Sequence, residues 1–251
     1  MDRVKPASGE RLQVALARHG LASRRGVVTM IEEGRVKVNG AVVREKGFRV
    51  NVSKDSIEAD GQELAALGDP FYKEYFIFNK PKGVMTTLQD PHATRTVADY
   101  FKDAGARLFP VGRLDRDTTG LLLMTNDGEL AFRLTHPKFG VKKKYRTVVD
   151  GLVTPEEAQR LEKGVNLEEG RTAPCKIEIQ TADLQESVLL VTLHEGKKRQ
   201  IRRIFQEIGH WVRALERLSY GPIHLGDLRP GAKRELAVRE VKLLKAAAGL
   251  Y

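Results

Sequence analysis

The eight residues LAALGDPF, at positions 64–71, divide the chain into two parts that differ in charge and pattern. Their Gly-Asp-Pro triplet breaks both helices and strands, so neither element is expected to cross it. Residues 1–54 hold 12 Lys and Arg against 5 Asp and Glu, whereas residues 55–70 hold 5 acids and no base. We therefore predict a small N-terminal domain at 1–68 and a larger domain at 69–251.

The chain of 251 residues carries a net charge of +10 at pH 7. Such a balance favours polyanions, and nucleic acid is the first partner to consider. No apolar run approaches the roughly 18 residues that a membrane span needs, and the first residues lack the apolar middle of a signal peptide. A single cysteine, Cys175, excludes an internal disulfide and a cysteine-rich metal site. We expect a soluble cytoplasmic protein without membrane contact.

The N-terminal part has the pattern helix, helix, hairpin. Apolar residues recur at helical spacing in residues 10–20, and Ser23 is placed to cap a second helix that runs to about Glu33. Asn39-Gly40, between valine-rich arms, predicts a tight hairpin turn. The segments GLASRR, MIEEGRVKVNG and VVREKGFRV resemble the S4 RNA-binding domain, over about residues 10–68. The resemblance implies RNA contacts by Ser23, Arg24, Arg25, Arg35 and Lys37.

The larger part contains more short strands than helices. Strand composition is found in EYFIFNK, KKKYRTVVDG and SVLLVTLHEG, and helices are expected in TPEEAQRLEKG, KRQIRRIFQEIGH and VREVKLLKAAAG. There is no regular βαβ repeat. We therefore predict an α+β fold in which a mixed, mainly antiparallel sheet has flanking helices.

The segment GRLDRDTTGLLLMTNDGEL places two acids directly before an apolar run. The run Leu121–Met124 must be buried and a turn is expected at Gly120, so Asp115 and Asp117 should lie at the rim of a buried strand. A carboxylate there stays ionised if a cation lies beside it, and the basic helix around 197–203 can supply an arginine. Such an acid can act as a nucleophile or stabilise an oxocarbenium-like sugar. Spacing alone also allows a simple Asp-capped turn, or the carboxylate pair of a glycoside hydrolase.

Four motifs resemble, in order, those of the RsuA/RluB branch of RNA pseudouridine synthases: FNKPKGVMTT, GRLDRDTTGLLLMTNDGELA, KKKYRT and EGKKRQIRRIF. An S4-like domain in front of them fits the same branch, so the match covers nearly the whole chain. The resemblance implies that Asp115 is the nucleophile, that Tyr145 stacks on the target base and that Arg202 pairs with Asp115. It implies further substrate contacts by Arg113, Lys197, Arg199, Ile201 and Arg203.

The implied reaction isomerises uridine to pseudouridine, so nothing is oxidised, added or lost. We therefore expect neither a cofactor nor a metal ion. The expected partner is ribosomal RNA, with 23S favoured over 16S, and the enzyme is expected to be a monomer. Within the site, the Lys80-Pro81 turn is expected to be structural and Asp117 to be a turn or capping acid. The alternative hypothesis is an RNA-binding protein with a synthase-like fold and no catalysis.

Overall fold

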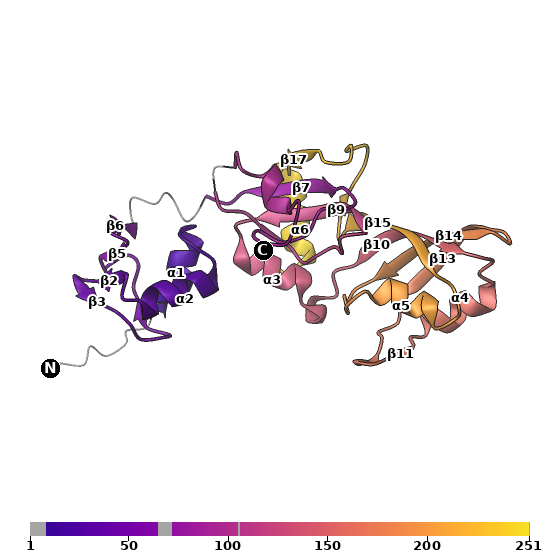
Figure 1. The fold of residues 1–251 in the computed structure, drawn as a ribbon, viewed down its shortest axis with the longest axis horizontal. Helices are drawn as coiled ribbons and strands as arrows, with labels where there is room; N and C mark the ends of the chain where they lie inside the picture. The colour runs from indigo at the N-terminus through magenta and orange to yellow at the C-terminus, as the bar shows by residue number, and fades with distance from the viewer. Residues whose placement is uncertain (1–8, 65–71, 105, 251) are drawn as a thin grey trace. The chain divides into compact units, whose positions relative to one another are not determined.

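The computed structural model describes residues 9–64, 72–104 and 106–250. The chain divides into two compact units, residues 1–73 and 74–251, which are drawn in Figure 1. The expected linker therefore lies almost entirely outside the described residues, and the division falls five positions after the boundary that we expected. In the described ranges, no helix is long and apolar enough to cross a membrane.

The N-terminal unit packs two helices against short strands. Its helices are α1 (Leu12–Arg18) and α2 (Arg24–Glu32). Its strands are β1 (Glu10–Arg11), β2 (Val36–Val38), β3 (Ala41–Val42), β4 (Arg49–Val50), β5 (Ile57–Ala59) and β6 (Gln62–Glu63). Strands β3, β2, β5 and β6 form one sheet in that order, and β1 pairs with β4. Leu12, Leu16, Val27 and Ile31 fill the core between the helices and strands.

Two local predictions for this unit are confirmed. Ser23 caps α2, because its Oγ accepts a hydrogen bond from the Gly26 backbone N–H at 3.0 Å. Asn39 and Gly40 both have positive φ, 51° and 81°, and they join β2 to β3 in a tight hairpin.

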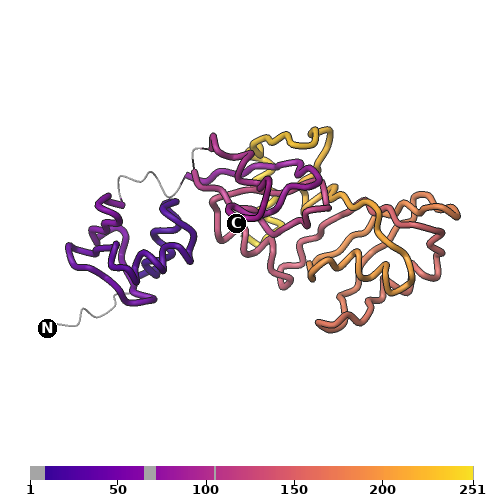
Figure 2. The backbone as a smooth tube through the Cα atoms, viewed as in Figure 1, coloured from indigo at the N-terminus to yellow at the C-terminus, as the bar shows by residue number. Residues whose placement is uncertain are grey.

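In the described part of the larger unit, nine strands form one sheet in the order β13-β14-β10-β15-β9-β7-β17, with β16 beside β15 and β8 beside β9. Figure 1 labels the strands of the main order, and Figure 2 traces the same backbone as a tube. They are β7 (Tyr75–Lys80), β8 (Phe109–Pro110), β9 (Thr119–Thr125), β10 (Lys143–Asp150), β13 (Lys176–Ala182), β14 (Glu186–Leu193), β15 (Val212–Tyr220), β16 (Ile223–His224) and β17 (Lys233–Glu235). Strands β9 and β15 run parallel through two residue pairs, and the other neighbours are antiparallel. The predicted α+β class with a mixed, mainly antiparallel sheet is confirmed.

Separate cores support the two halves of this sheet. Helices α3 (Gly128–Thr135) and α6 (Val238–Ala247) pack on one face of β7 and β9, through a cluster that includes Leu121, Leu123 and Leu130. A second cluster, with Leu114 and Leu122, covers the other face of these strands. Helices α4 (Pro155–Glu162) and α5 (Gln200–Gln206) pack on β10, β14 and β15. The other short elements are η2 (Val97–Tyr100), η3 (Pro137–Phe139), β11 (Asn166–Leu167) and β12 (Gly170–Arg171).

Gly120 is not in a turn, and on this point the sequence prediction is wrong. It lies inside β9 with φ at 98°, beside Arg217 of β15. A Cβ atom on Gly120 would lie 2.4 Å from the Arg217 carbonyl oxygen and 2.7 Å from its nitrogen. The glycine is therefore required by the close approach of two backbones.

Candidate active site

The loop that carries Asp115 runs from β8 to β9 and is held from both sides. Leu114 is buried, and its carbonyl accepts from the Thr86 hydroxyl at 2.7 Å, while its N–H donates to the same oxygen at 3.3 Å. On the other side, the Gly83 N–H donates to the Arg116 carbonyl at 2.7 Å. These bonds fix the backbone on each side of Asp115, so the direction of its side chain is constrained.

Lys80 builds the turn to which this loop is tied. The side chain is fully buried at the end of β7, and its Nζ donates to the carbonyls of Val84 at 2.7 Å and Pro81 at 3.0 Å. Burial lowers the pKa of Lys80 to about 8, although the charges of Asp117 and Asp115 oppose that shift. Lys80 thus shapes the segment that holds the acid loop, as expected for a structural residue.

Asp115 and Asp117 lie among guanidinium groups from the start of α5. Arg199 Nη1 is 3.8 Å from Asp115 Oδ2 and 3.3 Å from Asp117 Oδ1. Arg202 Nη2 is 3.0 Å from Asp117 Oδ2. The side chains of Asp115 and Asp117 are 34% and 39% exposed, against 12% for Arg202. Both acids can therefore be reached from solvent while a buried cation fixes one of them.

The expected pair of Arg202 with Asp115 is not formed in this structure. Arg202 pairs with Asp117 instead, and Asp115 forms its ion pair with Arg199. The cause is the local chain path, because the Thr118 N–H donates to the Asp115 carbonyl at 3.0 Å. This turn brings Asp117 toward α5, so Asp117 does more than terminate a loop.

The electrostatic balance favours an ionised Asp117. Burial alone would raise the pKa of Asp117, but Arg202 and Arg199 hold it below its usual range. Burial lowers the pKa of Arg202, and the Asp117 charge counteracts this effect. Asp115 therefore lies in a site whose neighbouring acid is already paired, which leaves its own carboxylate accessible.

Tyr145 lies on β10, on the same sheet face as the core of α4 and α5. It stands opposite Val191 of β14 on one side and Arg217 of β15 on the other. Arg217 also stands opposite Gly120 of β9. Tyr145, Arg217 and Gly120 therefore form one row across β10, β15 and β9, and β9 is the strand that directly follows Asp115 and Asp117. The Tyr145 ring also packs against the cluster that contains Leu114. Tyr145 and the Asp115 loop thus share one packed cluster.

Two of the side chains that were expected to contact the substrate bind other parts of the protein. Lys197 Nζ donates to the carbonyls of Gly170 and Arg171, each at 2.8 Å. Arg203 forms two bonds of 2.7 Å with the Glu169 carboxylate. Both cations therefore connect α5 to the β11–β12 hairpin. These contacts direct neither side chain toward Asp115 or Asp117.

The remaining expected contacts fall in different places. Arg199 reaches both acids, as described above. Ile201 is 4% exposed and packs in the core under α5, so its contact with a substrate stays a prediction. Arg113 is exposed beside the acid loop.

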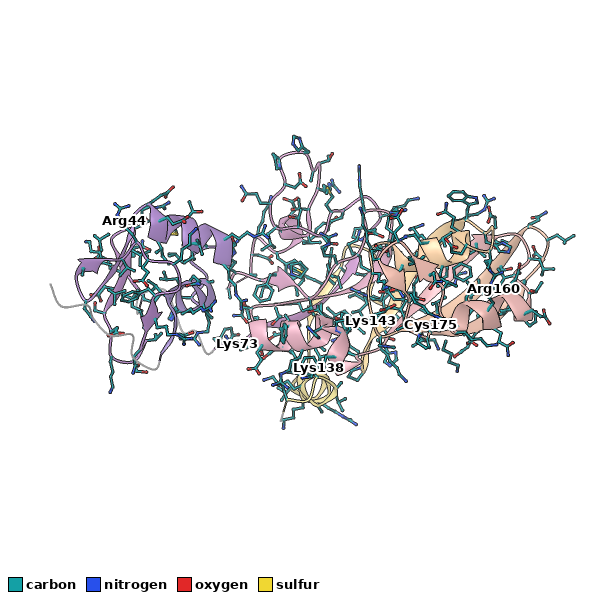
Figure 3. All side chains as sticks on the ribbon, turned by 90° about the horizontal axis from the view of Figure 1, so that it is seen from below. Arg44, Lys73, Lys138, Lys143, Arg160 and Cys175 are labelled. Carbon is teal, nitrogen blue, oxygen red and sulfur yellow. The ribbon has the colours of Figure 1, made fainter. Side chains whose placement is uncertain are left out.

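Two buried cations were not identified from the sequence. Arg217 on β15 is 3% exposed, and Lys143 on β10, labelled in Figure 3, is 6% exposed. The Lys143 Nζ lies 5.0 Å from the ring centre of Tyr220 and 3.4 Å from the His194 carbonyl oxygen. Burial, followed by the nearby Arg217 charge, lowers the pKa of Lys143 to about 8. Strand alternation with apolar neighbours was the signal that could have revealed both.

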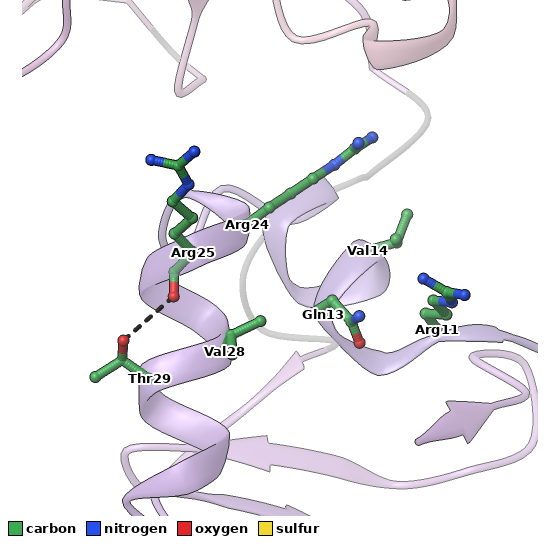
Figure 4. A pocket seen from close by; sticks show the side chains of 7 residues that line it. All are labelled: Arg11, Gln13, Val14, Arg24, Arg25, Val28 and Thr29. Carbon is green, nitrogen blue, oxygen red and sulfur yellow. Dashed lines mark hydrogen bonds between the residues drawn. The ribbon is translucent and has the colours of Figure 1, made fainter. Parts of the chain in front are cut away.

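The N-terminal unit has a pocket of about 460 Å³ between α1 and α2 (Figure 4). It is lined by Arg11, Gln13, Val14, Arg24, Arg25, Val28 and Thr29. Arg24 and Arg25 are exposed on the first turn of α2, and within the described residues no carboxylate pairs with either guanidinium. Their charges are thus available to an external anion.

The other two expected RNA-binding cations already have acidic partners. Arg35 binds both oxygens of Asp60, at 2.7 and 2.6 Å, and also Glu33 at 3.0 Å. Lys37 binds Glu58 at 2.9 Å. Neutralised in this way, Arg35 and Lys37 contribute less to the attraction of a polyanion than Arg24 and Arg25.

Comparison with known proteins identifies the family. The model of the RNA pseudouridylate synthase family matches residues 74–207, and that of the S4 domain matches residues 10–56. The chain is 46% identical over 241 residues to the "Ribosomal large subunit pseudouridine synthase B" of Bacillus subtilis, covering 95% of this chain and 97% of that one. It is 42% identical over 241 residues to an uncharacterised RNA pseudouridine synthase of Aquifex aeolicus, covering 96% and 95%.

Among solved structures, a crystal structure of a pseudouridylate synthase matches with a TM-score of 0.67 and 29% identity, covering 94% of this chain and all of that one. Sequence and fold therefore agree over both units. The acids, the arginines of α5 and Tyr145 all fall in the unit that the synthase model matches. The chain belongs to the RsuA/RluB family of RNA pseudouridine synthases, which are isomerases, and it carries an S4 domain at its N-terminal end.

Proposed function

We propose that this enzyme isomerises uridine in the RNA of the large ribosomal subunit and that Asp115 is its nucleophile. The B. subtilis relative, at 46% identity over nearly the full length of both chains, is named for that subunit. The observation that carries the site assignment is the Asp115 carboxylate itself. It is one-third exposed, its loop is clamped on both sides, and it lies beside Arg199.

The chemistry exchanges two pairs of bonds in the same pocket. The N1–C1′ bond of uridine breaks, the uracil turns over and C5 bonds to C1′; the C5 proton then leaves to solvent and N1 takes up a proton. Asp115 can take part by attack on C1′, by removal of the 2′ proton to give a glycal, or by attack on C6 of the base. Each route needs an accessible carboxylate, and the Asp115 side chain is about one-third exposed beside Arg199.

Tyr145 and the arginines then act on the rest of the nucleotide. A uridine stacked in RNA has to be flipped out before its glycosidic bond can be reached. The Tyr145 ring, which packs beside the cluster under the acid loop, offers a flat surface on which the flipped base can stack. Arg113 and Arg199 are exposed near the acids and can hold the adjoining phosphates. All these groups come from one unit of one chain, so a monomer is sufficient.

The test compares wild-type enzyme with Asp115→Asn, which removes the charge and keeps the size. The control is Asp183→Asn, the same change in an exposed acid that accepts bonds from the Gln185 and Glu186 N–H groups in the β13–β14 turn. Tritium release from 5-³H-uridine transcripts of 23S and 16S rRNA is measured, with RNA binding as a second readout. We expect Asp115→Asn to lose at least about 10³-fold in rate and to bind RNA normally.

Other outcomes would change the assignment. Preference for the 16S transcript would refute the large-subunit proposal, and release of free uracil would show hydrolysis. Asp117→Asn should lose about 10-fold, because Arg199 and Arg202 lose their shared partner. If Asp117→Asn were the inactive variant and Asp115→Asn the active one, Asp117 would be the nucleophile. Tyr145→Ala should be inactive, because no ring remains on which the base can stack.

A further inference from the structure

Arg217 is a buried cation that takes no part in the proposed reaction. It is 3% exposed, and in the described part of the chain no carboxylate forms an ion pair with it. Its Nε donates to the Leu121 carbonyl at 2.6 Å, and its Nη1 lies 3.5 Å from the Tyr145 hydroxyl oxygen. Its Nη2 is buried without a hydrogen-bond partner. Keeping an unpaired guanidinium away from water is costly, so its retention calls for an explanation.

The sheet register directs this guanidinium to one hydroxyl. Arg217 stands directly opposite Tyr145, so their side chains share a face of the sheet. The Arg217 Cζ lies 6.0 Å from the Tyr145 ring centre and 5.0 Å from that of Tyr220. The Tyr220 hydroxyl donates to the Leu134 carbonyl at 2.8 Å, which turns it away. Arg217 therefore touches Tyr220 through its ring and Tyr145 through its oxygen.

We propose that Arg217 is a positioning residue that makes the Tyr145 oxygen an acceptor and so directs the Tyr145 hydroxyl hydrogen to the bound nucleotide. A guanidinium has donors and no acceptor, so at this contact the phenol oxygen must accept. The phenol hydrogen then points elsewhere, toward the pocket in which the base is stacked. This inference rests on the proposed role of Tyr145 beside the flipped uridine.

The geometry allows the contact to tighten when substrate binds. At 3.5 Å the bond from Arg217 to Tyr145 is at the long limit for a hydrogen bond, so a small movement would strengthen it. Because Nη2 of Arg217 makes no hydrogen bond, the guanidinium can move toward the Tyr145 hydroxyl without breaking a bond at that nitrogen. The bond from Nε to Leu121 holds the side chain in register meanwhile.

The experiment is a double-mutant cycle between Arg217→Met and Tyr145→Phe, read as kcat and KM for pseudouridine formation on the 23S transcript. We expect Arg217→Met to lower kcat about 30-fold with KM nearly unchanged. In the Tyr145→Phe background, the same change should cost less than about 3-fold, because no hydroxyl remains to be oriented. Equal losses in both backgrounds, or a fully active Tyr145→Phe, would overturn the proposal.

Two further variants separate the contact from burial. Lys143→Met removes another buried cation, whose Nζ faces the Tyr220 ring, and kcat should not change. Arg217→Lys keeps the charge and loses the fork that spans Leu121 and Tyr145, so it should behave as Arg217→Met does, and it carries the cycle if Arg217→Met fails to fold. Full activity of Arg217→Lys would refute the geometry. A wild-type enzyme that forms no pseudouridine would instead refute the proposed function, and an additive cycle in an active enzyme refutes this inference alone.

Discussion

Among the described residues, no arginine or lysine of the N-terminal unit is buried, whereas the synthase unit buries Lys80, Lys143 and Arg217. Arg24 and Arg25 are exposed, and Arg35 is about half exposed with acids around it. In the synthase unit, Lys80, Lys143 and Arg217 are 0%, 6% and 3% exposed. Backbone carbonyls and the Tyr145 hydroxyl oxygen, rather than carboxylates, receive the hydrogen bonds of these buried cations.

This difference separates two uses of positive charge. An exposed cation attracts phosphates from a distance, but salt screens it and its geometry is loose. A buried cation cannot attract RNA, and its desolvation lowers stability, but its position is fixed by the groups around it. The first unit is therefore suited to hold a polyanion, and the second to align groups for a reaction.

Among the cations of the two units, the largest effect should come from Arg202, whose side chain is only 12% exposed beside Asp117. Arg202→Ala removes the cation 3.0 Å from Asp117 and the bond to the Val212 carbonyl. We expect kcat to fall by about 10² to 10³ and the free energy of unfolding by roughly 1 to 2 kcal/mol. The control is Arg203→Ala on the same helix, where the guanidinium binds Glu169. Turnover and thermal melts are measured for both variants. Equal losses in kcat would show that the cation beside Asp117 matters no more than the one bound to Glu169.

Removal of the first unit should weaken binding without changing the chemistry. A chain that starts at residue 72 keeps the synthase unit with its own cores. We expect RNA affinity to fall about 10- to 100-fold, and the salt slope to flatten by roughly 0.7 to 0.9 for each lost phosphate contact. At saturating enzyme and low salt, the rate should recover. An unchanged salt slope would show that the first unit does not bind this RNA.

A third test measures the cost of a buried charge. Lys143→Met should raise the free energy of unfolding by roughly 2 kcal/mol at pH 7, about 30-fold in the folding equilibrium. The pKa of Lys143 falls from 10.5 to about 8 on folding, so the unfolded chain binds more protons between these values. Wild-type stability therefore rises across this window, and its gap to the variant should close by about pH 10.5. A gap independent of pH would contradict this account.

The smallest effect should distinguish two kinds of surface cation. Arg24→Gln with Arg25→Gln removes two charges without acidic partners among the described residues, and affinity should fall about 5-fold with a lower salt slope. Arg35→Gln with Lys37→Gln removes the same number of charges from existing ion pairs, so affinity should change less than 2-fold. Titrations at several salt concentrations compare the pairs. The reverse order would show that RNA displaces Asp60 and Glu58.

Local chemistry made part of the fold predictable. Ser23 as a cap and Thr154-Pro155 at the start of α4 each depend on neighbouring residues, so sequence was sufficient. Helix α3 was missed, because its eight residues directly follow an apolar strand and extend the same apolar stretch. Gly120 was misplaced, because its partner Arg217 lies almost a hundred residues away.

Candidate site residues could be named from the sequence, but their partners could not. Asp115, Tyr145 and Arg202 were named from motifs, while the pairing of Arg202 with Asp117 follows from a turn that only the folded chain reveals. The binding of Arg203 to Glu169 joins a helix to a distant hairpin, and no local pattern predicts it. Long-range contacts of this kind decide which cations are left without an acidic partner. The spacing of residues along one sequence does not reveal such contacts.

The parallel junction of β9 and β15 has a mechanical consequence. Two residue pairs, Glu216 with Thr119 and Arg217 with Gly120, join the halves of the sheet, so this seam is short compared with the ladders on either side. Asp115 belongs to one half, and Tyr145 to the other. Shear along the seam would move the two halves of the sheet as rigid bodies. The distance between Asp115 and Tyr145 therefore depends on how each half is packed. A substitution in the core that supports either half can therefore lower the rate of the proposed reaction without altering Asp115 or Tyr145.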